Sequence, residues 1–135
     1  MELRGHGVIA TFVASGDMNT DALQFRFVRQ SAGVDEDVFI ADTSGSPAVV
    51  GVNQDKVSDN QHVRVAVGQF TKIRLASSLG AAIWLTSDGA GYGIQYTGQS
   101  GSACLGRLVT GATSGAPGEM FFVKSPLTSS VAIVQ

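Results

Sequence analysis

Apolar and polar residues alternate along most of this chain, which predicts short β-strands separated by glycine-containing turns. In the segment 62–67, HVRVAV, three valines alternate with a histidine, an arginine and an alanine. Alternation of this kind is typical of a strand with one buried face. A longer strand pair is expected to start at His62 and to include Ile73 and Leu75. The other predicted strands are 23–30, 37–42, 48–52, 81–86, 94–97, 102–109, 120–124 and 131–134.

Glycines mark the points where this pattern changes. Gly51 lies inside a predicted strand and indicates a bulge or a close approach of two backbones. Asp88-Gly89 is a strong hairpin signal. Phe70 falls on the opposite parity from Ile73 and Leu75. Either a bulge at Gly68 turns Phe70 inward, which we favour, or Phe70 is exposed and part of an interface.

The first 22 residues are predicted to form an N-terminal arm, and residues 23–135 a single domain. The arm contains one apolar run, Val8 to Val13, which is too short and too β-branched to predict a helix. Two interpretations remain open for this run: it adds a strand to another molecule, or it is the first strand of the domain's own sheet.

These elements predict an all-β fold, a small β-barrel or sandwich of about eight short strands with an extended N-terminal arm. Short strands at spacings near ten residues, 17 glycines and no helical periodicity fit this class. No segment repeats at a period of 20–50 residues, which excludes solenoids and propellers.

Composition adds the expectation of a partner. Charged residues make up 15 % of the chain, against about 25 % in soluble domains, so part of the surface is expected to be buried in an assembly. The net charge of −2 carries no basic excess for nucleic acid. No apolar run is long enough to span a membrane, and no signal peptide is visible. Cys104 lies in an apolar segment and is expected to be a buried thiol. A protein made in a cytoplasm is therefore expected.

The chain offers no pattern for catalysis. Its two histidines, His6 and His62, are far apart and lack a nucleophile in a recognisable motif. One cysteine and two histidines do not predict a zinc site. Glu119, beside a Pro-Gly loop, is expected to be a turn residue. We therefore expect no enzymatic activity, no cofactor and no metal.

Five motifs follow one another in a fixed order. They are a VVGV-type phrase at 48–52, a Val-rich strand ending in Gly at 63–68, a Gly- and Trp-containing hairpin at 80–91, the LGR phrase at 105–107 and an apolar strand at 118–124. In this order they resemble the capsid decoration, or cement, proteins of tailed bacteriophages. The resemblance covers a little over half of the chain.

The resemblance implies a compact β-domain, often trimeric, that binds the major capsid protein on the outside of a phage head. It implies a virion protein made in the bacterial host cytoplasm, with neither cofactor nor activity. The alternative is a virion-associated carbohydrate-binding or host-adhesion module, with Trp84, Tyr92 and Tyr96 as its platform. The candidate interface residues are Val8, Ile9, Phe12, Val13, Phe70, Trp84, Tyr92, Val131 and Ile133.

Overall fold

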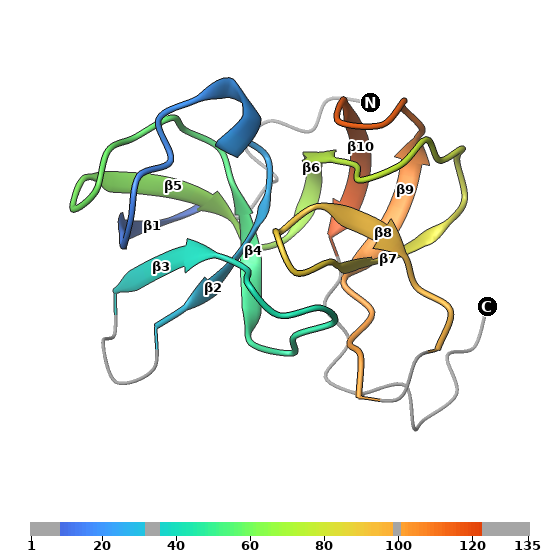
Figure 1. The fold of residues 1–135 in the computed structure, drawn as a ribbon, viewed down its shortest axis with the longest axis horizontal. Coiled ribbons are helices and arrows are strands. Elements are labelled where there is room, and N and C mark those ends of the chain that lie inside the picture. The colour runs from blue at the N-terminus through green and yellow to red at the C-terminus, as the bar shows by residue number, and fades with distance from the viewer. Residues whose placement is uncertain (1–8, 32–35, 99–100, 123–135) are drawn as a thin grey trace.

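The computed structural model describes residues 9–31, 36–98 and 101–122, which fold into two neighbouring β-structures (Figure 1). The predicted all-β class is confirmed, since these residues hold ten strands and a single short 3₁₀ turn, Asp21–Leu23. The strands are β1 (Ile9–Ala14), β2 (Phe27–Gln30), β3 (Asp37–Ile40), β4 (Val49–Asn53), β5 (His62–Ala66), β6 (Gln69–Arg74), β7 (Trp84–Ser87), β8 (Gly93–Gln95), β9 (Gly106–Thr110) and β10 (Pro117–Phe122).

The first five strands close into a barrel in the order β1-β3-β2-β4-β5, drawn in blue to green in Figure 1. Two interpretations were open for Val8 to Val13. In the structure, residues 9–14 form the first strand of the chain's own sheet. Along β1, Ile9 to Val13 pair antiparallel with β5, and Val13 and Ala14 pair parallel with β3. This part of the predicted arm therefore helps to close the barrel.

The last five strands form a second sheet in the order β6-β10-β9-β7-β8. Leu75, just after β6, makes a parallel bridge to Gly93 of the far edge strand β8, so the sheet curls back on itself. The chain passes from barrel to sheet between Ala66 and Gln69. The expected strand pair starting at His62 is therefore wrong in one respect, because β5 and β6 belong to different sheets.

Two clusters of buried apolar side chains hold the fold together. One fills the barrel and includes Val28, Val38 and Val63. The other combines Phe27 and Val52 of the barrel with side chains of the second sheet: Ile73, Leu75, Leu85, Leu105, Leu108, Met120 and Phe122. Because this second cluster contains residues of both β-structures, the two halves share a core.

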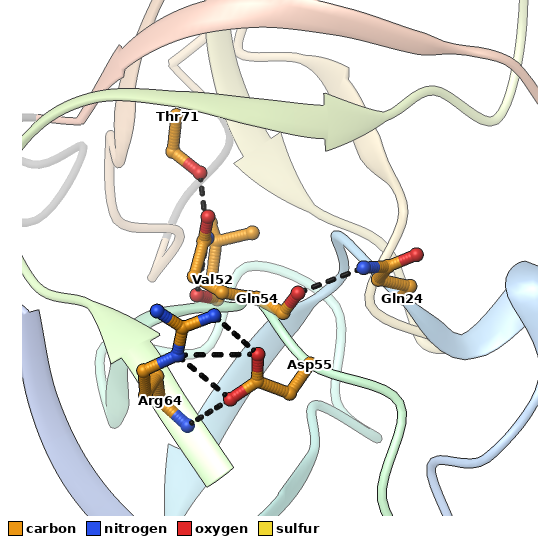
Figure 2. Close-up of polar contacts among 6 residues, drawn as sticks. All are labelled: Gln24, Val52, Gln54, Asp55, Arg64 and Thr71. Atoms are coloured by element: carbon orange, nitrogen blue, oxygen red, sulfur yellow. Dashed lines mark hydrogen bonds and ion pairs between the residues drawn. The ribbon is translucent and has the colours of Figure 1, made fainter.

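A polar contact crosses the same junction (Figure 2). The Gln54 side-chain amide donates to the Thr71 hydroxyl on β6 at 2.8 Å and to the Val52 carbonyl at 2.9 Å. Gln24 donates to the Gln54 carbonyl at 2.8 Å. The Gln54–Thr71 bond links the end of β4 to β6, since Gln54 follows β4 directly. The other two bonds join Gln54 to residues of the first half of the chain.

Several predicted boundaries are corrected. The strand expected at 23–30 begins only at Phe27, because Phe25 has a φ of 62°, in the left-handed region that breaks an extended strand. The last described strand begins at Pro117, earlier than expected, so Glu119 lies in a strand and not in a turn. The predicted strand 131–134 lies outside the described residues.

The expected hairpin at Asp88 forms between β7 and β8, but its turn differs from a two-residue one. The Asp88 carboxylate accepts hydrogen bonds from the backbone N–H groups of Ala90 and Tyr92 at 2.8 and 2.9 Å. Gly91 takes the positive φ of 83°, where a side chain would also meet the Phe27 carbonyl. The turn is thus built by an aspartate side chain and Gly91.

Candidate functional site

One row of large side chains crosses the outer face of the second sheet. Phe70 of β6 is opposite Phe121 of β10, Phe121 is opposite Arg107 of β9, and Arg107 is opposite Trp84 of β7. Residues directly opposite on neighbouring strands share a face. These four residues, here called the aromatic row, therefore form a continuous line over four adjacent strands.

The members of the aromatic row contact one another. The rings of Phe70 and Phe121 are stacked, with centroids 5.1 Å apart and planes inclined by 26°. The Arg107 guanidinium carbon lies 5.5 Å from the centroid of the Trp84 ring, within the range of a cation–π contact. Phe70 and Phe121 are each 40 % exposed. Arg107 is exposed too, and Trp84 is half-buried. The row is therefore an apolar, positively charged surface that is open to solvent along most of its length.

An open pocket of about 350 Å³ adjoins the Phe70 end of the row. Its lining includes Phe70, Val109 and the oppositely charged Lys72 and Glu119, which face each other across β6 and β10. Val109 is 46 % exposed. Three of the four large, well-exposed apolar side chains in the described part of the chain thus lie on this one face. Apolar patches of this kind mark interaction sites.

The arrangement favours a protein contact over chemistry. Phe70 and Phe121 present their faces to each other, and Arg107 lies over Trp84, so these contacts occupy ring faces that a flat ligand would use. Aromatic residues and arginine are the types that contribute most to protein interfaces. Within the described ranges, no group of three or more His, Cys, Asp or Glu residues is placed to hold a metal ion.

The structure places the predicted interface residues in different surroundings. Phe70 is exposed, so the favoured inward turn at Gly68 is wrong: Phe70 faces outward while Thr71 and Ile73 are buried. Ile9 is 50 % exposed at the start of β1. Phe12 is half-buried and packs against the barrel core, and Val13 is half-buried beside β3. Val8, Val131 and Ile133 lie outside the described residues.

Tyr92 contributes to the junction between the two halves rather than to the aromatic row. Its hydroxyl accepts a hydrogen bond from the Arg26 guanidinium at 2.6 Å, and the same guanidinium lies 3.9 Å from its ring centroid. Arg26 is only 8 % exposed and also donates to the carbonyls of Ala22 and Ala90. Tyr92 therefore helps to satisfy a buried cation.

Other predictions from single residues can be compared with the structure. Cys104 is buried as expected, and this burial raises the pKa of its thiol. His62 is exposed at the start of β5. No helix among the described residues is long and apolar enough to cross a membrane.

Comparison with known proteins rests on structure, since no protein-family model and no curated protein sequence matches the chain. Among solved structures, it is similar to the N base of head fiber gp8.5 in bacteriophage phi29. The superposition has a TM-score of 0.58 at 16 % identity and covers 90 % of this chain and 98 % of that chain. The two chains share a fold. At this identity, the likeness concerns the fold alone.

Sequence reasoning missed Phe121, Arg107 and Val109. Their signal is present in the alternation of the segments around them, GEMFF and GRLVT, where each lies on the face opposite the buried Met120 or Leu108. What the alternation cannot show is that β10 lies between β6 and β9. That order brings Phe121 between Phe70 and Arg107.

Proposed function

We propose that this protein is a structural component of a phage virion, attached to the outside of the head. The observation that carries the proposal is the fold shared with the N base of the phi29 head fiber, which extends over 90 % of this chain. The exposed aromatic row supports it, because such a surface suits a protein that functions in an assembly.

In its finer form, the proposal is that the protein binds the major capsid protein and stabilises the mature head, as a homotrimer and without enzymatic activity. Binding only to the mature lattice would stabilise that lattice by mass action. Many copies, each bound weakly, would add their effects through avidity. The resemblance of the sequence motifs to decoration proteins supports this form.

The test uses heads of the phage that encodes the protein, prepared without the protein. The purified protein is mixed with these heads and sedimented with them. A comparison of the full chain with a variant starting at Ile9 tests the segment before β1 without removing a barrel strand. We expect the full chain to pellet with heads and to raise the temperature at which they release DNA. A full chain that stays in the supernatant at every concentration would refute the proposal.

A second candidate function is a carbohydrate-binding module of the virion. It is supported by the backbone N–H of Tyr96, which donates to the Trp84 carbonyl at 2.7 Å and so brings two of the three predicted platform residues together. Tyr92, the third, contacts Arg26 instead. A glycan array with wild type and Trp84→Ala tests it, and equal signals from both proteins would exclude this platform.

A further inference from the structure

The two halves of the molecule differ in charge. Residues 9–31 and 36–66, which build the barrel, contain seven carboxylates and four Lys or Arg, a net charge of −3. Residues 69–122 contain two carboxylates and three Lys or Arg, a net charge of +1. The charge of the chain is therefore divided between a negative barrel and a slightly positive second sheet.

The negative charge gathers where β1 ends. Asp37 is opposite Val13, and the Glu36 carbonyl accepts a hydrogen bond from the Val13 N–H at 2.7 Å. Asp59 accepts from the Gly16 N–H, and Asp17 accepts from the Asp59 N–H. These four residues, Asp17, Glu36, Asp37 and Asp59, are here called the acidic end. In the described part of the chain, the ion pairs use other carboxylates: Asp21, Asp42 and Asp55.

The aromatic row carries the opposite charge. Arg107 is a member of it, and Lys72 is a neighbour of Phe70 on the same face. Neither cation takes part in an ion pair between described residues. The same face also carries Glu119, which is opposite Lys72 on β10, so Arg107, Lys72 and Glu119 together give it a net charge of +1. One molecule thus presents an apolar face of net positive charge on its sheet and an acidic end on its barrel. A row-to-row contact would bring together two faces that each carry a net charge of +1, which like-charge repulsion disfavours.

We propose that the aromatic row of one molecule binds the acidic end of a second copy, in a head-to-tail contact. Such a heterologous contact closes into a ring if its rotation allows, and otherwise continues as a filament. Phe70 and Phe121 supply the apolar anchor, while Arg107 and Lys72 face carboxylates of the neighbour. The inference deepens the self-association included in the proposed function by naming the two surfaces, but it does not require a phage head.

Two variants, one for each surface, test the aromatic row and the acidic end separately. Phe121→Ser removes an exposed ring from the row. The pair Asp17→Asn with Glu36→Lys removes charge from the acidic end, and asparagine retains an oxygen that can accept from the Asp59 N–H. Ile9→Ser is the control, because it removes another exposed apolar side chain outside both surfaces. Circular dichroism checks that each variant is folded. If Phe121→Ser does not fold, Arg107→Glu takes its place as the variant of the aromatic row.

Sedimentation velocity of the full chain gives the result. We expect wild type and Ile9→Ser to associate at micromolar concentrations, more weakly as salt rises because screening reduces the charge contribution. Each surface variant alone should associate at least about tenfold more weakly, since central aromatic residues dominate such contacts. A mixture of the two should form a one-to-one dimer, since one keeps the acidic end and the other keeps the row.

Three outcomes would overturn the inference: a monomeric wild type at about 100 µM, a mixture that fails to form the dimer, or wild type that binds glycans through Trp84 while staying monomeric. Wild type that associates as expected but ignores heads would leave the inference standing and refute the proposed function. Head binding by a protein that remains a monomer would overturn the inference and the homotrimer, and would leave attachment to the head standing.

Discussion

At the scale of single residues, two arginines connect the halves of the molecule through neutral acceptors. Arg26 donates to the carbonyls of Ala22 and Ala90 and to the Tyr92 hydroxyl. Arg74 donates to the carbonyls of Asp21, Gln24 and Gly115. A guanidinium holds its donors in a fixed plane, so it can bind several carbonyls at once. These side chains thus set how the barrel and the sheet meet.

Arg26→Ala is expected to lower the free energy of unfolding by about 1–3 kcal/mol, because its part-buried hydrogen bonds to two carbonyls and the Tyr92 hydroxyl are lost. Arg64→Ala is the matched control, since the Arg64 side chain is 64 % exposed and pairs with Asp55 at the surface. Arg64→Ala should lower the free energy of unfolding much less than Arg26→Ala does. Urea denaturation followed by circular dichroism measures both, and equal losses would contradict this role for Arg26.

The Asp55–Arg64 pair predicts a dependence of stability on pH. Hydrogen bonds from the Arg64 guanidinium hold the pKa of Asp55 below its ordinary value, although partial burial opposes the shift. Asp55 is therefore ionised more readily in the folded state. Its contribution to stability is present above the unfolded pKa of about 3.9 and is lost as pH falls through the lower folded value.

The expected result is that wild type loses more stability than Asp55→Asn between pH 5 and about pH 2, because the variant has no carboxylate to protonate there. Thermal unfolding across this range measures the difference. Parallel curves for the two proteins would show that the pair contributes nothing measurable.

At the scale of elements, Gly51 shows how closely two barrel strands approach. A Cβ on Gly51 would clash with the Ala66 carbonyl oxygen of β5. The pairing of β2 with β4 also shifts register between Val28 and Arg29, opposite Gly51 and Val49. The sequence predicted a bulge or a close approach at this glycine, and the structure has both.

Gly51→Ala should destabilise the barrel by more than 1 kcal/mol, on the order of the cost of overpacking, because the obstacle is backbone and cannot rotate away. Gly80→Ala is its control, since a Cβ there meets nothing within 4 Å. Midpoints of thermal unfolding distinguish the two variants. A Gly51→Ala protein as stable as the control would mean that β4 and β5 can separate without cost.

At the scale of the whole molecule, the shared core predicts that barrel and sheet unfold together. Phe27 of β2 is fully buried, and its ring centroid lies 6.4 Å from that of Phe122 of β10. Fluorescence of Trp84 on β7 and far-ultraviolet circular dichroism should therefore give coincident urea transitions. Phe27→Ala should shift both curves equally, by about 3–5 kcal/mol. Separate transitions would show two independent halves.

The sequence alone determined those features that depend on residues adjacent in the chain. Alternation of side chains along a strand is a local property, so it predicted the all-β class, the position of most strands and the burial of Cys104. It predicted strand ends less well, because the left-handed Phe25 and the strand position of Glu119 depend on contacts with other segments.

Only the tertiary structure decided how the strands are shared between a barrel and a second sheet. The aromatic row exists because Phe70 and Phe121, about 50 residues apart in the chain, pair across β6 and β10. The periodic pattern of one strand says which face is buried, but not which strand lies beside it. That choice comes from packing all ten strands around common cores, and it turns separate exposed residues into one surface.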